Sequence, residues 1–109
     1  MNLNDKVKDF TDAIKKTREY IELKQAQALI NKNPGLKKKV EEIKKKQQEI
    51  LMQYKPGQNK LESKILELNE EIKNISVVPE VNRYFAARIN FNNMISKMYT
   101  IINEAIECD

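Results

Sequence analysis

The residue types that most often perform chemistry in proteins are scarce in this sequence. It has no histidine, which is the commonest general base and a common metal ligand. Its single cysteine is Cys108, and iron–sulfur clusters are held by several thiolates. No glycine-rich phosphate loop and no motif that activates a serine hydroxyl is present. We therefore expect no enzymatic activity, no metal and no cofactor, since Cys108 could ligate a cluster only together with thiolates from other chains.

The lysines gather in one stretch and could bind an acidic partner. Residues 32–60 contain nine lysines and three glutamates, a net charge of +6, whereas the whole chain carries +4. A basic face made of Lys37, Lys38, Lys45 and Lys46 is suited to phosphates or to acidic protein groups. That face has no aromatic side chain for base stacking, and glutamates alternate with its lysines, as on solvated helices. Three interpretations stay open: a solvated surface, contact with an acidic protein, and nucleic-acid binding.

Glycine and proline divide the chain into four segments. All of them fall at Pro34-Gly35, Pro56-Gly57 and Pro79, and such residues begin or end helices. Between these breaks, apolar residues recur at three- and four-residue spacing, which is typical of amphipathic helices. Asn33 is placed to cap the helix that starts at Pro34. The sequence predicts a single all-α domain over residues 1–109, with four amphipathic helices at about 4–32, 34–54, 59–76 and 79–107.

The second and third predicted helices each carry a narrow apolar seam. One seam includes Leu36, Val40, Ile43 and Ile50, and the other includes Leu61, Ile65, Leu68, Ile72 and Ile75. The seams have similar length, and a short turn at Pro56-Gly57 separates them. This arrangement predicts an antiparallel helical hairpin with coiled-coil-like packing, within a helical bundle.

The last predicted helix, residues 79–107, has a wider apolar face and carries most of the aromatic residues. We expect it to be the core helix on which the other helices pack. Narrow seams elsewhere leave little enclosed core in a chain of 109 residues, so we expect a homo-oligomer, most simply a dimer. The expected interface residues are Phe85, Phe91, Ile95, Tyr99 and Ile102.

The expected cellular compartment of the protein is inferred from sequence features. No apolar run approaches the roughly 18 residues needed to span a bilayer, and the polar first residues do not form a signal peptide. One cysteine cannot form an internal disulfide. We expect a cytoplasmic protein that does not bind membranes.

Several short motifs resemble one family when they are taken in order. They are Ala13-Ile14-Lys15 with Glu19-Tyr20, Ile30-Asn31-Lys32-Asn33-Pro34-Gly35-Leu36, Lys46-Gln47-Gln48, and Val78-Pro79-Glu80-Val81-Asn82-Arg83-Tyr84-Phe85-Ala86-Ala87 with Phe91-Asn92 and Ile101-Ile102. The chain resembles the YlbF/YmcA-like regulators of Gram-positive bacteria, which include YheA-type proteins, over nearly its whole length. Better-studied members carry cysteines in C-terminal extensions, associated with iron–sulfur clusters. This chain departs from that pattern, because it has only Cys108.

The resemblance implies a small, cytoplasmic, all-helical protein without catalysis of its own. Members form complexes with related YlbF/YmcA-type proteins and with YaaT, and they influence competence, biofilm formation, sporulation and RNase Y-dependent mRNA processing. Our first hypothesis is therefore a regulatory adaptor that acts by protein–protein contact. The alternative is a nucleic-acid-associated protein that uses the lysine-rich face of the second predicted helix. A third possibility is a helical-hairpin chaperone that holds clients between its arms.

Overall fold

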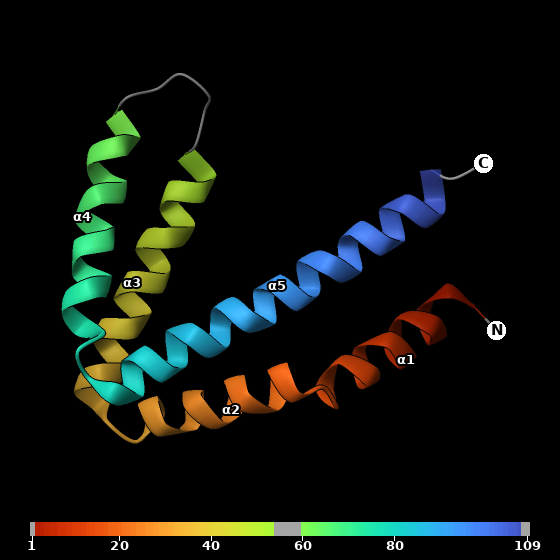
Figure 1. Ribbon diagram of the computed structural model, residues 1–109, viewed down its shortest axis with the longest axis horizontal. Coiled ribbons are helices and arrows are strands. Elements are labelled where there is room, and N and C mark those ends of the chain that lie inside the picture. The colour runs from red at the N-terminus through yellow and green to blue at the C-terminus, as the bar shows by residue number, and fades with distance from the viewer. Residues whose placement is uncertain (1, 54–59, 108–109) are drawn as a thin grey trace. The chain divides into compact units, whose positions relative to one another are not determined.

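The computed structural model describes residues 2–53 and 60–107, and every regular element within that part of the chain is a helix (Figure 1). The order is α1 (Leu3–Lys15), α2 (Arg18–Asn31), α3 (Pro34–Gln53), α4 (Lys60–Ile75) and α5 (Pro79–Glu107). The predicted all-α class is confirmed. Two predicted breaks coincide with helix starts at Pro34 and Pro79, whereas the turn predicted at Pro56-Gly57 lies outside the described residues. None of the described helices is both long and apolar enough to cross a bilayer.

The first predicted helix, residues 4–32, is two helices in the structure, so the prediction of four helices is wrong. The break lies at Thr17, whose Oγ1 accepts a hydrogen bond from the amide of Tyr20 at 3.2 Å. The Thr17 hydroxyl also donates to the carbonyl of Ile14 at 2.6 Å, and the Thr17 amide donates to the same carbonyl at 3.0 Å. A threonine side chain in this position caps the start of the following helix, because it satisfies an amide that has no intrahelical partner.

The chain divides into two compact units, which are described separately. The first comprises Met1–Ala28 and Tyr84–Asp109, and so contains α1, most of α2 and most of α5. The second comprises Leu29–Arg83 and contains α3 and α4, together with the end of α2 and the start of α5.

The second unit is built around the pair of helices α3 and α4, which pack side by side and run in opposite directions (Figure 1). Their buried residues are Val40 and Ile43 on α3 and Leu61 and Leu68 on α4, all of which belong to the predicted seams. The cap predicted at the start of α3 is confirmed, since Asn33 Oδ1 accepts a hydrogen bond from the Leu36 amide at 3.2 Å. Apolar contact between the seams is therefore what holds this hairpin together.

In the first unit, burial is concentrated near the start of its α5 segment. Tyr84, Phe85 and Ala87 are buried, and the rings of Tyr84 and Phe85 meet edge to face with centroids 5.4 Å apart. Further along, Phe91 is half-buried and its ring centroid lies 6.1 Å from that of Tyr20 on α2. The beginning of α5 is therefore the part of this helix that is buried within the unit, whereas residues 99–107 of α5 are exposed.

Candidate functional site

One face of the α3–α4 hairpin is hollowed into a groove whose lining residues recur every seven positions. Two adjoining hollows of about 210 and 370 Å³ share Lys46 and Glu71. The groove is lined on α3 by Leu36, Lys39, Glu42, Ile43, Lys46, Glu49, Ile50 and Gln53, and on α4 and just after it by Lys64, Glu67, Leu68, Glu71, Asn74, Ile75 and Val78.

The spacing explains why these side chains share one face. Leu36, Ile43 and Ile50 lie seven residues apart on α3, as do Leu68 and Ile75 on α4. Seven residues make almost two turns of an α-helix, so such residues form a row along one side of it. Charged rows with the same interval flank the apolar rows. The result is an apolar strip bordered by ammonium and carboxylate groups.

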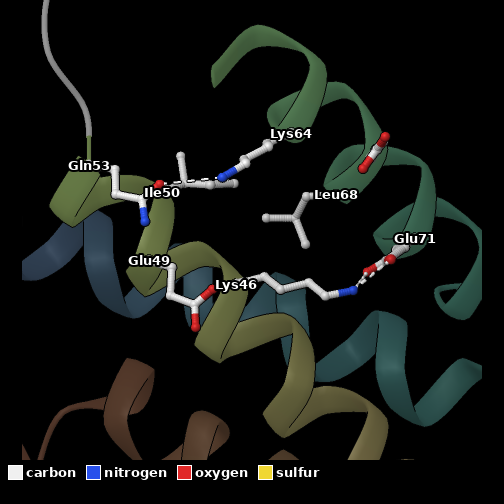
Figure 2. A pocket seen from close by; sticks show the side chains of 8 residues that line it. Lys46, Glu49, Ile50, Gln53, Lys64, Leu68 and Glu71 are labelled. Carbon is white, nitrogen blue, oxygen red and sulfur yellow. Dashed lines mark hydrogen bonds and ion pairs between the residues drawn. The ribbon is translucent and has the colours of Figure 1, made fainter. Parts of the chain in front are cut away.

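An ion pair joins the two helices across the groove (Figure 2). The ammonium of Lys46 lies 2.8 Å from Glu71 Oε1 and 3.0 Å from Oε2. The hydrogen bond to Glu71 raises the pKa of Lys46 above its ordinary value, and the carboxylates of Glu42 and Glu67 act in the same direction. Both side chains of the pair are about half exposed, so water competes strongly for the contact. The pair therefore contributes little to the stability of the fold.

The end of the groove nearest the α3 C-terminus carries a second polar link. Lys64 Nζ lies 3.4 Å from Gln53 Oε1, with Ile50 and Leu68 between the two helices (Figure 2). Counting all charged lining residues, the groove holds three lysines and four glutamates. Its charge is therefore nearly balanced, unlike the uniformly basic channels that follow a nucleic-acid backbone.

The structure separates the four residues of the predicted basic face. Lys46 lines the groove and pairs with Glu71, whereas Lys37, Lys38 and Lys45 are exposed and line neither hollow. From the sequence, the glutamates of the facing helix were expected to accompany the lysines on a partner-binding arm, but none was named as a site residue, and Lys64 was not considered. The seven-residue spacing of these residues could have predicted that they share one face of α4. The sequence does not predict which of them pairs with a residue of α3.

The five predicted interface residues all lie on the α5 part of the first unit, but they differ in exposure. Phe85 is 9% exposed, and Phe91 and Ile95 are half-buried. Tyr99 and Ile102 are exposed. These residues therefore do not form one continuous free surface. The sixth candidate, Cys108, lies outside the described residues, and among the residues that are described no group of three or more histidine, cysteine, aspartate or glutamate side chains is arranged to hold a metal ion.

Comparison with known proteins identifies the family. The model of the Com_YlbF family, described as "Control of competence regulator ComK, YlbF/YmcA", matches residues 3–107. Searches of curated proteins and of solved structures find no match to the chain. The matched region takes in all five helices and the whole groove, as the motif order predicted. Because the match covers nearly all of the 109 residues, the chain belongs to the YlbF/YmcA family.

Proposed function

We propose that this protein is a non-catalytic regulatory adaptor, and that the α3–α4 groove is the surface with which it binds a protein partner. The description of its family as control of the competence regulator ComK supports a regulatory role. We choose this surface because of the groove itself. The groove has an apolar strip, borders with charges of both signs, and lining residues that recur every seven positions.

This lining is suited to an amphipathic helix of the partner. A helix laid along the groove presents side chains at the same seven-residue interval, so its apolar row can follow the half-buried members of the strip, which are Leu36, Ile50 and Ile75. Leu36 to Gln53 on α3 corresponds to roughly 25 Å of helix, or about five turns. The partner helix would need charges of both signs on its flanks, since lysines and glutamates both border the strip.

Nucleic-acid binding by the exposed lysines is the competing function. Lys37, Lys38 and Lys45 are free of groove contacts and could approach phosphates. The groove is unsuited to this task, because Glu49, Glu67 and Glu71 would repel a phosphate backbone. The two functions thus rely on different residues and can be separated by mutation.

The test compares two double charge reversals, one inside the groove and one outside it. The partner is first isolated by affinity purification from the native host and then purified, so that association rates can be measured. Lys39→Glu with Glu67→Lys changes the groove without changing net charge. We expect it to slow association, most visibly at low salt, because mispaired charges oppose docking.

The control variant is Lys37→Glu with Lys38→Glu, which leaves the groove lining intact but lowers the net charge from +4 to 0, so its rate is compared with the wild type at high salt, where long-range steering is screened. We expect it to bind the protein partner with nearly the wild-type rate. If both variants associate as the wild type does, the groove is not the binding surface. If the control variant instead abolishes a strongly salt-dependent RNA binding while groove reversal does not, the nucleic-acid alternative is correct.

A further inference from the structure

The two polar links between α3 and α4 mark the register of the hairpin, and this register determines the order of charges along the groove. Lys46 contacts Glu71, and Lys64 contacts Gln53. On each helix the two linked positions are seven residues apart, so the links lie at two matching levels, roughly 10 Å from each other along the antiparallel helices. The other lining residues can therefore be assigned to levels by counting along their helices.

The level between the two links carries one carboxylate from each helix. Glu49 lies three residues after Lys46 on α3, and Glu67 lies three residues after Lys64 on α4. Both glutamates are exposed, and both line the same hollow. Their sequence neighbours Ile50 and Leu68 form the apolar centre of the groove at this level (Figure 2). A molecule lying on this apolar centre would therefore have a negative charge on each side.

A third carboxylate, that of Glu42, lies one turn before Lys46 on the α3 border. The pKa of Lys46 is raised by its hydrogen bond to Glu71, and also by the negative charges of Glu71, Glu42 and Glu67. Together with Glu49, four carboxylates and one ammonium group line the middle of the groove, which gives this part a net charge of −3.

Lysines line both ends of the groove. Lys39 lies seven residues before Lys46, toward the start of α3, and Lys64 lies at the level of Gln53, toward the opposite end. The groove is thus basic, acidic and again basic along its length, although the whole chain carries +4. A net positive charge attracts acidic molecules at long range. Any preference for a basic ligand in the middle of the groove would therefore come from the groove itself.

We propose that the groove binds an amphipathic helix of another protein whose flanks are basic in the middle and acidic at both ends. This inference rests on the proposed function, because it names the chemistry of the partner helix for the same groove. Lysine or arginine side chains on the two flanks would meet Glu49 and Glu67 while the apolar row covers Ile50. Acidic side chains toward the ends would meet Lys39 and Lys64. Such complementarity selects a partner, because a helix with the opposite order would place like charges together.

Two synthetic helical peptides of about five turns test the proposal. They have one composition and one apolar row at the seven-residue interval. In the first peptide lysines flank the middle and glutamates flank the ends, and in the second these positions are exchanged. An exposed ion pair changes affinity roughly 1.5- to 5-fold, so contacts with three carboxylates predict that the basic-centred peptide binds about tenfold more tightly at low salt. Fluorescence anisotropy of labelled peptides, titrated with the purified whole chain, measures both affinities.

A double variant locates the preference in the groove. Glu49→Gln with Glu67→Gln removes two charges with little change in side-chain size, and we expect the preference to fall to roughly twofold. The matched control is Glu41→Gln with Glu70→Gln, which changes the net charge equally at exposed positions that line neither hollow. This control should keep the tenfold preference.

Three results would overturn the proposed charge order: equal affinities for the two peptides, no measurable binding of either, or a preference that survives in the groove variant. Tighter binding of the acidic-centred peptide would also overturn it, and would show that the net charge of +4 governs binding. The adaptor function fails on a different result, which is unaltered partner association in the variant Lys39→Glu with Glu67→Lys. A groove that binds its protein partner without preferring either peptide would therefore leave the adaptor function standing.

Discussion

Leu66 and Leu68 offer a sharp test of the packing that forms the groove, because the same substitution can be made two residues apart on α4. Leu68 is 7% exposed and packs between α3 and α4, whereas Leu66 is 67% exposed. Replacing a buried leucine by alanine costs about 2–5 kcal/mol, through lost transfer free energy and the remaining cavity. Leu68 also lines the groove, which limits the cavity that its truncation encloses, so we expect Leu68→Ala to cost about 2–3 kcal/mol.

Leu66→Ala is the matched control. It removes the same atoms from a side chain that is mostly in water already, and alanine has the better helix propensity, so its effect should stay within about 0.5 kcal/mol. The measurement is urea unfolding followed by circular dichroism, at equal protein concentration for all variants because self-association would change the apparent stability. If the two substitutions lower the free energy of unfolding equally, then α3 and α4 do not pack through Leu68 and the groove is not formed as described.

Two further predictions concern single contacts. Phe91→Ala should lower the free energy of unfolding by about 1.5–2.5 kcal/mol, roughly half the value for a fully buried phenylalanine, because Phe91 is half-buried against Tyr20. A loss as large as that of a core phenylalanine in urea unfolding would show that a further partner covers the ring. For Lys46→Gln, the difference from wild type should be small and constant between about pH 6 and pH 10, where both groups of the pair are charged, because the pKa of Lys46 is raised from 10.5 in the folded state. On the alkaline side, the contribution of its pair with Glu71 is lost as the pH rises through the folded pKa of Lys46, so a difference that changes between about pH 6 and 9 would contradict the assignment.

Local signals in the sequence were enough to predict the all-helical class and the hairpin seams. Pro34 and Pro79 begin helices because their fixed backbone angle and missing amide suit the first helical position. Val40 and Ile43 are buried as the apolar repeat predicted. The break at Thr17 escaped prediction for a physical reason. Thr17 continues the heptad row of its segment, and its capping role depends on hydrogen bonds that periodicity does not report.

The site was less predictable than the fold. The spacing of apolar residues identifies the apolar face of a helix, but it does not show which other helix packs on that face. The apolar repeat of α5 runs along the helix with polar interruptions at Arg88 and Asn92, yet Phe85 is buried while Tyr99 on the same face is exposed. Likewise, the lysine run predicted a basic face, but the register of α3 against α4 pairs Lys46 with Glu71 and turns part of that face into a groove of mixed charge. That register is a property of the packed hairpin, and no residue in either helix specifies it alone.

The central claim is that the α3–α4 groove binds a protein partner, and amide hydrogen exchange with and without the purified partner tests it most directly. Exchange slows where binding suppresses local opening of the backbone. We predict that the partner slows exchange along α3 and α4, over residues 36–53 and 64–75, and leaves α1 and residues 95–107 of α5 unchanged. Slower exchange confined to α1 and the end of α5, with α3 and α4 unaffected, would contradict the claim.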